Sequence, residues 1–388
     1  MDSPKPLEVG EVKAHLKKLV QQTLQEALEG ELDEFLGYSK HQRKPADNSR
    51  NGKATKSLQT ENGEIELQVP RDRKSRFEPK IVKKRQTVLE DLQDKIIAMY
   101  SKGMTTRDIQ DFVQDMYGVE ISPSLISRLT DRLLPRIEEW QSRPLKEVYV
   151  MAWLDCLFYK IREENKVINK AIYVIIGLNA DGHKDILGFW INQKESSSFW
   201  LGVLNDLKSR GVRDVFIFSV DGLAGFEQAI HTVYPQAEVQ QCLVHQVRNT
   251  LRYVAWKDRR ELSQDLKTIY RAPTLEEAQA ALDRFDEKWS RKYPHILKSW
   301  RANWDRLMTY FRYPIEIRKL MYTTNLIESV NSKFRKASDA RRVFPSNDAI
   351  LKVLYMAAME LEKKWTMPIR DWPLIYAQLM ILFEGRLS

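Results

Sequence analysis

Three acidic residues, Asp155, Asp221 and Glu328, occupy positions that suit the chemistry of a divalent cation. Asp155 interrupts the apolar stretch 148–161, and a carboxylate in a buried strand is costly unless it is paired or binds a cation. Asp221 directly follows the apolar run 215–220. The structural alternatives are a buried ion pair for Asp155 and a helix N-cap or turn for Asp221. Three carboxylates are enough to hold two Mg²⁺ ions, with Mn²⁺ as a substitute, for cutting and joining phosphodiesters.

Glu328 lies in the first turn of a predicted helix, and two readings of it stay open. With Asn325 as N-cap, Glu328 three residues later would complete a capping box. In the functional reading it is the third metal ligand, and Arg335, two turns later on the same face, contacts a phosphate.

Cys242 and His245 form a single Cys-x-x-His pair just after the second aspartate. The pair is half of a zinc site and no second half is visible, which disfavours structural zinc. His245 could bind a phosphate or shuttle a proton as an auxiliary catalytic residue, and a packed core pair is the alternative. We leave the role of Cys242 open.

The elements around these residues follow a specific order. Strands are predicted at 148–161, 170–178 and 184–192, then a helix at 197–208, a strand at 215–220, a helix at 226–233 and a strand at 238–243. This is the order of the ribonuclease H-like fold, in which the first and fourth strands are neighbours. We therefore expect Asp155 and Asp221 to meet. The next 75 or so residues are predicted to be helical, and one of their tryptophans could stack on an unpaired base.

Positive charge is concentrated near the N-terminus. The net charge is +9, and residues 40–85 alone contain 14 Lys and Arg against 6 Asp and Glu. Such a segment attracts a polyanion, because neutralised phosphates release counterions; a solvated linker is the alternative. The candidate DNA contacts in this segment are Lys53, Lys56, Arg71, Arg73, Lys74 and Arg76.

Two short helices resemble a helix-turn-helix. The first begins at a capping box of Thr105 and Asp108 and ends at Gly118, with Ile109, Phe112, Val113 and Met116 on one face. The second is capped by Ser122 and directs Ile126, Leu129 and Leu133 inward. Its exposed side would face the major groove of double-stranded DNA, and a helical hairpin without DNA is the alternative. The candidate contacts are Arg107, Ser124, Arg128 and Arg132.

The N-terminal helix 12–36 has a broad apolar face that must pack on something, and a second subunit is one candidate, giving a homodimer or higher oligomer. The segment 365–383 is aromatic-rich and predicted to be helical. Two cysteines exclude a disulfide framework, and we expect an intracellular protein because neither a signal sequence nor an apolar span is visible.

The sequence resembles the Mutator-type transposases of bacterial insertion sequences over almost its whole length. The matching motifs are Leu36-Gly37-Tyr38, Asn51-Gly52, Val69-Pro70-Arg71-Asp72-Arg73, Ser101 to Ile109, Trp153-Leu154-Asp155, Val220-Asp221-Gly222-Leu223, Cys242 to Gln246, Tyr322 to Ser329 and Lys364 to Pro368. The resemblance implies an Asp155, Asp221 and Glu328 triad, an all-helical insertion, a cytoplasmic, nucleoid-associated bacterial enzyme, and a copy-out, paste-in route through a circular intermediate.

We therefore divide the chain into an N-terminal helical region (1–38), a basic DNA-contacting segment (39–88), a helix-turn-helix-like domain (89–142), a ribonuclease H-like core (143–245 and 321–345) interrupted by a helical insertion (246–320), and a C-terminal helical segment (346–388). The predicted protein is a transposase that binds the terminal inverted repeats of its element. There are two alternatives. One is a nuclease of the same fold that cuts without joining, and the other is a domesticated DNA-binding regulator without catalytic activity.

Overall fold

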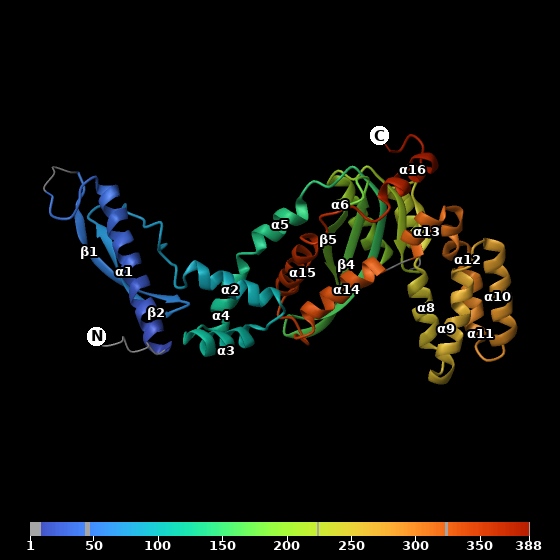
Figure 1. Ribbon diagram of the computed structural model, residues 1–388, viewed down its shortest axis with the longest axis horizontal. Coiled ribbons are helices and arrows are strands. Elements are labelled where there is room, and N and C mark those ends of the chain that lie inside the picture. Colours follow the sequence, from blue (N-terminus) through green and yellow to red (C-terminus); the bar gives the residue numbers. More distant parts are fainter. Residues whose placement is uncertain (1–8, 43–46, 223–224, 323–324, 388) are drawn as a thin grey trace, which may run out of the picture. The chain divides into compact units, whose positions relative to one another are not determined.

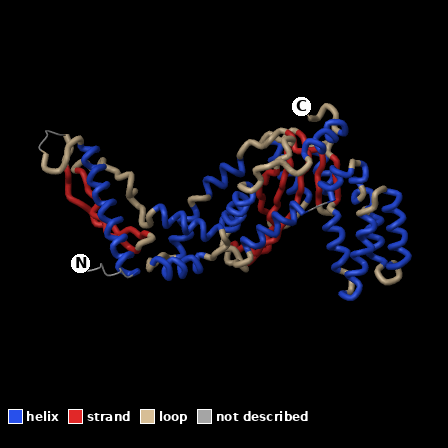
Figure 2. The backbone as a smooth tube through the Cα atoms, in the orientation of Figure 1, coloured by secondary structure: helices blue, strands red, loops and turns tan. Residues whose placement is uncertain are grey.

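The computed structural model describes residues 9–42, 47–222, 225–322 and 325–387 (Figure 1). The chain forms two compact units, Met1–Leu133 and Leu134–Ser388. Figure 2 shows that the first unit contains a helix on a strand pair and a group of short helices, whereas the second contains the larger sheet. No helix in the described ranges is long and apolar enough to cross a membrane.

In the first unit, helix α1 (Val9–Leu36) packs on an antiparallel hairpin of β1 (Arg50–Thr60) and β2 (Gly63–Asp72). Leu28 is fully buried against the apolar side of the hairpin. The apolar face of α1 is thus partly covered by its own chain, but Leu16 and Leu19 are 42% and 52% exposed. The hairpin thus buries the C-terminal half of the apolar face of α1 and leaves the N-terminal half exposed to solvent.

The alternating sequence 64–69 alone predicts one short strand that Pro70 ends, whereas the structure has a hairpin of two strands. The strand β2 continues to Asp72, and Pro70 pairs with Lys53 in the register. A two-stranded hairpin has two edges, so a residue without an N–H is tolerated there. The strand β1 was missed because its first half, Asn51-Gly52-Lys53-Ala54, consists of residues with low β-propensity.

Three helices follow: α2 (Glu90–Ser101), α3 (Thr106–Tyr117) and α4 (Pro123–Asp131). The predicted caps are confirmed, since Thr105 and Asp108 form a capping box and Gly118 adopts φ 64° at the C-cap. Ser122 accepts a hydrogen bond from the Leu125 N–H, which caps α4. The inward positions are confirmed for Ile109, Val113, Ile126, Leu129 and Leu133.

On the apolar face of α3 predicted from the sequence, Phe112 and Met116 are 40% and 51% exposed. The helix α3 packs mainly against α2 and α4, and its buried residues are Ile109 and Val113. The wider apolar face that the sequence suggested has no covering element within the described part of this unit.

The second unit begins with α5 (Leu134–Ser142) and contains a mixed five-stranded sheet in the order β5-β4-β3-β6-β7. The strands are β3 (Val148–Glu163), β4 (Lys166–Asn179), β5 (Lys184–Asn192), β6 (Asp214–Val220) and β7 (Glu238–Gln241). The first three are antiparallel, and β6 and β7 run parallel to β3. The predicted meander and the buried strand 215–220 are confirmed.

Helices α6 (Ser197–Ser209) and α7 (Phe226–Val233) pack on the sheet through a large apolar core that includes Trp200 and Phe218. Helices α14 (Asn325–Ser338) and α15 (Asn347–Glu362) also contact the sheet, with Phe334 of α14 against Phe189 of β5. Leu243 belongs to a helix rather than to the last strand, since β7 already ends at Gln241.

The segment between the sheet and α14 is helical, as predicted: α8 (Leu243–Arg252), α9 (Trp256–Tyr270), α10 (Leu275–Trp289), α11 (Pro294–Ala302), α12 (Trp304–Leu307), a 3-10 turn (Thr309–Arg312) and α13 (Ile315–Tyr322). Trp289 and Trp300 are core residues, whereas Trp256 is 85% exposed. The C-terminal segment forms α16 (Trp372–Leu382), and Phe383 stacks on Phe216.

Candidate metal-binding site

The parallel pairing of β3 and β6 brings the two aspartates together. Trp153 lies opposite Ser219 in the register, and Asp155 and Asp221 each follow two residues later in the chain. Because side chains alternate along extended backbone, equal steps from a paired position place both carboxylates on the same face at the same level. The predicted meeting of Asp155 and Asp221 therefore has a direct cause in the strand register.

His245 joins the aspartates from the first turn of α8. Val220 pairs with Gln241, and the Cys242 N–H donates to the Val220 carbonyl at 2.8 Å, so α8 starts beside the end of β6. His245 Nδ1 forms an ion pair with Asp221 Oδ1. One ligand atom from each of Asp155, Asp221 and His245 lies within 4.8 Å of the others.

The charges in this group influence one another strongly. Burial raises the pKa of Asp155; the neighbouring His245 lowers it and Asp221 raises it again, leaving a net increase. Burial lowers the pKa of His245, but hydrogen bonds with Asp221 and Cys242 outweigh it and raise that pKa to about 11. Without a cation, a protonated His245 supplies the positive charge that the two carboxylates require.

Glu328, the predicted third ligand, lies in the first turn of α14. Its carboxylate forms an ion pair with Arg248, which lies one turn after His245 on α8. On α14, Asn331 lies one turn after Glu328 and donates its Nδ2 hydrogen bond to Asp155 Oδ2. Glu328 is therefore one helical turn from a contact of Asp155, but its carboxylate is outside the three-residue group. The capping-box alternative needs the Asn325 side chain, which lies outside the described residues.

Two side chains at the site were missed from the sequence. Asn331 is 4% exposed and contacts Asp155, although the two residues are 176 positions apart in the chain. Glu195 precedes α6 and accepts a hydrogen bond from Trp200 Nε1 at 3.3 Å. Burial raises the pKa of Glu195, and Asp221 and Asp155 act in the same direction, so it is a further carboxyl group near the pair. The sequence signal that could have identified Asn331 is its position three residues after Glu328, which puts both side chains on the same side of the predicted helix.

The donor set fits a divalent cation. Asp155 and Asp221 offer the hard oxygen ligands that Mg²⁺ prefers, and Asp155 is 7% exposed. In addition, Asn331 Oδ1 is buried and has no hydrogen-bond partner within the described ranges. A buried polar atom without a partner is costly, so an amide oxygen beside two carboxylates is suited to a cation or its water shell.

Some of the predicted DNA contacts of the first unit have protein partners for their charged groups, and the others are exposed without an ion pair in the described ranges. Lys53 pairs with Glu29, Lys74 pairs with Asp47, and Arg132 hydrogen-bonds to Gln93. Lys56 donates to the Lys83 carbonyl at 2.5 Å, and burial lowers the pKa of Lys56. The remaining predicted contacts are exposed: Arg71, Arg73, Arg76, Arg107, Ser124 and Arg128. Arg335 in the second unit is also exposed.

Comparisons with known proteins identify the family. The sequence matches the family described as "Transposase, Mutator family" over residues 4–368. The transposase for insertion sequence element ISRM3 of Rhizobium meliloti (strain 1021) is 42% identical over 372 residues, which are 96% of this chain and 92% of that protein. The transposase for element IS1201 of Lactobacillus helveticus is 33% identical over 349 residues, 89% of this chain and 94% of that protein.

Among solved structures, the Drosophila P element transposase strand transfer complex matches at 10% identity over 76% of this chain and 87% of that chain. The TM-score is 0.29, at which the likeness carries no argument about the fold. The family match and the curated relatives cover nearly the whole chain, including all the residues of the site. The chain belongs to the Mutator family of transposases.

Proposed function

We propose that this protein is a DNA transposase that cuts and joins strands at the terminal inverted repeats of its own insertion sequence, in the bacterial cytoplasm. The observation that carries the proposal is the meeting of Asp155, in the middle of β3, with Asp221, directly after the end of the parallel strand β6, in a Mutator-family chain. The sheet with α6 and α7 has the element order of a ribonuclease H-like core, interrupted by α8–α13.

Asp155, Asp221 and Glu328 would hold two Mg²⁺ ions, with Mn²⁺ as a substitute. When bound, such ions activate the attacking oxygen and stabilise the leaving oxygen of an in-line displacement. Asn331 holds the Asp155 carboxylate in place through its amide N–H. His245 orients Asp221 and can hold a proton at Nδ1, and Arg248 keeps the Glu328 carboxylate at the edge of the site. These partners thus fix the orientation of the three carboxylates before a metal ion binds.

The test is cleavage and joining of a labelled DNA duplex that contains one end of the element, with Mg²⁺, with Mn²⁺ and with EDTA. We expect both cut and joined products with either metal and neither product with EDTA. Cutting without joining would instead identify a nuclease, and DNA binding without cutting would identify a regulator. The copy-out route, which rests on family resemblance, predicts circles in which the two ends abut, and amplification across that junction detects them.

We further propose that the first unit binds the duplex of the element end through the exposed side of α3 and α4. Arg107 and Arg128 are exposed, and neither has an ion-pair partner in the part of the chain that the structure describes. The double variant Arg107→Gln and Arg128→Gln should weaken duplex binding at least about tenfold and reduce the salt slope by about 1.8, since each phosphate contact contributes about 0.9. Titrations at several salt concentrations measure both quantities.

The matched control is Lys53→Gln, because Lys53 already pairs with Glu29 and should contribute little. An equal effect of the control and the double variant would contradict a helix-turn-helix role and favour the hairpin as the DNA contact.

A dimer is the simplest assembly that can hold two element ends. We propose that the exposed apolar part of α1, Leu16 and Leu19, contributes to its interface. Light scattering should give a dimer for the wild type and a monomer for Leu16→Glu with Leu19→Glu, whereas a monomeric wild type would exclude this contact.

A further inference from the structure

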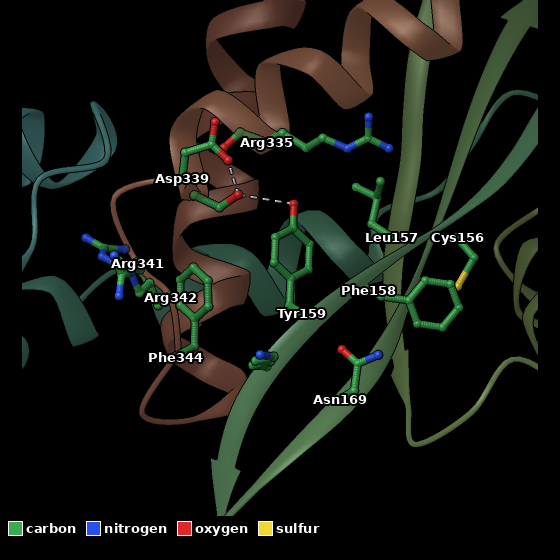
Figure 3. Close-up of a pocket in the computed structure, with 12 residues that line it drawn as sticks. Cys156, Leu157, Phe158, Tyr159, Asn169, Arg335, Asp339, Arg341, Arg342 and Phe344 are labelled. Carbon is green, nitrogen blue, oxygen red and sulfur yellow. Dashed lines mark hydrogen bonds between the residues drawn. The ribbon is translucent and has the colours of Figure 1, made fainter. Parts of the chain in front are cut away.

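A groove of about 600 Å³ lies next to the aspartate pair, between one edge of β3 and the C-terminal end of α14 (Figure 3). Its wall includes Leu157, which lies two residues after Asp155 on β3 and therefore on the same face of the sheet, so the groove lies next along the strand from the candidate metal site. Figure 3 shows the Arg335 side chain extending from α14 towards Leu157 and Cys156 of β3. None of the roles assigned above to the metal site uses this groove.

The groove exists because β3 is longer than its neighbour β6. Pairing with β6 ends at Trp153, and the next partner on that side is Phe344, which bridges to Ile161. There, the Phe344 N–H donates to the Lys160 carbonyl and the Arg162 N–H donates to the Phe344 carbonyl, both at 2.8 Å. Backbone groups of alternate residues point to the same edge of a strand, so those of Phe158 face the same edge as those of Lys160 and Arg162. Phe158 lies in the unpaired stretch of this edge, between the β6 pairing that ends at Trp153 and the bridge to Phe344.

The lining is strongly basic. Lys160, Arg335 and Arg342 are exposed lining residues, and none of them has an ion-pair partner within the ranges that the structure describes. Asp339 is the acidic residue of the lining. Uncompensated positive charge in a concave surface attracts phosphate groups. Arg335 lies one turn after Asn331, the contact of Asp155, so the charge continues along α14 from the metal site.

One aromatic side chain of the groove is exposed and the others are fixed. Tyr159 packs edge-on against Phe344 with ring centroids 5.9 Å apart, and Ser338 hydrogen-bonds to its hydroxyl at 3.3 Å. Phe344 is buried, whereas Phe158 is 53% exposed. In Figure 3 the Phe158 ring lies close to Cys156, apart from the Tyr159 and Phe344 rings. Phe158 and Lys160 are two residues apart on β3 and lie on the same face of the strand. An exposed ring next to a basic side chain is an arrangement on which unpaired bases stack.

We propose that this groove binds an unpaired stretch of the DNA strand beside the bond that is cut, with phosphates on Lys160, Arg335 and Arg342 and a base stacked on Phe158. This inference rests on the proposed function for the identity of the ligand. An intact duplex keeps its bases stacked on one another, so Phe158 can accept a base only where pairing has been lost. The groove therefore favours a locally opened end.

The experiment measures binding of two labelled oligonucleotides in EDTA: the single strand of the element end and the same sequence as a duplex. Phe158→Ala should weaken single-strand binding by about fivefold or more and change duplex binding by less than about twofold. Phe158→Trp, which keeps an aromatic face, should bind the single strand like the wild type. The double variant Arg335→Gln and Arg342→Gln should lower the single-strand salt slope by about 1.4, because each phosphate contributes about 0.7.

Matched controls come from the neighbouring strand β4. Val167 is 51% exposed and lies outside the groove lining, and Lys166 beside it is also exposed, so Val167→Ala and Lys166→Gln should leave binding unchanged. Equal single-strand binding by wild type and Phe158→Ala would overturn the proposal, as would equal losses on single strand and duplex. Binding in EDTA needs no catalysis, so the binding result tests the groove independently of strand cutting. A wild type that fails to cut and join would contradict only the proposed function.

Discussion

Glu328→Gln should abolish both strand cutting and strand joining, by at least about a thousandfold, while the protein stays folded and binds the element end. A thousandfold loss corresponds to ~4 kcal/mol of transition-state stabilisation, within the several kcal/mol that metal ions supply in such reactions. Glutamine keeps the length and hydrogen-bonding capacity of glutamate, so it can still serve a capping box. It lacks the charge that binds Mg²⁺.

The same variant separates the catalytic role of Glu328 from a structural one. In the structure Glu328 pairs with Arg248, and a purely structural pair would predict that Glu328→Gln and Arg248→Gln lose similar stability and keep activity. Glu287→Gln, on the exposed side of α10, is the matched control and should be fully active. Product yields on a labelled element end, together with thermal melting, distinguish these cases. Normal cutting by Glu328→Gln would remove this residue from the triad.

The sheet could be predicted from sequence because each of its strands has a strong local signal. The stretch 215–220 is continuously apolar, which is typical of a strand buried on both faces, and β6 occupies 214–220. The meeting of Asp155 and Asp221 followed from strand order alone. The strand β1 has no such signal, because Leu58 is its one large apolar residue and the rest of its sequence is polar or small.

The surroundings of the aspartates could be predicted only in part. The Cys-x-x-His spacing identified His245, but its ion pair with Asp221 depends on how closely α8 follows β7. The contacts of Arg248 and Asn331 arise where α8, before most of the helical insertion, and α14, after it, pack beside the site. Helix periodicity gives the face of a helix but not its neighbour, so these contacts required the tertiary structure.

Asp155→Asn should remove both the activity and the stabilisation of the protein by magnesium. A ligand present at one hundred times its dissociation constant stabilises the folded state by ~2.7 kcal/mol. For a unit of this size that corresponds to a rise in melting temperature of about 5–10 °C for the wild type. The variant loses an ionic ligand and should show a rise of less than about 2 °C at the same Mg²⁺ concentration. Melting curves with Mg²⁺ and with EDTA measure the difference.

In EDTA the effect of Asp155→Asn should be reversed in sign or absent. Asp155 is buried beside Asp221, and burying two like charges costs free energy unless a cation compensates them. Asparagine keeps the shape and removes one charge, so the variant should melt at or above the wild-type temperature. Asp348→Asn, at an exposed position of α15, should behave like the wild type in both conditions. If Asp155→Asn melts far below the wild type in EDTA, Asp155 supports the fold itself, and its grouping with Asp221 and His245 would then be structural rather than a cation site.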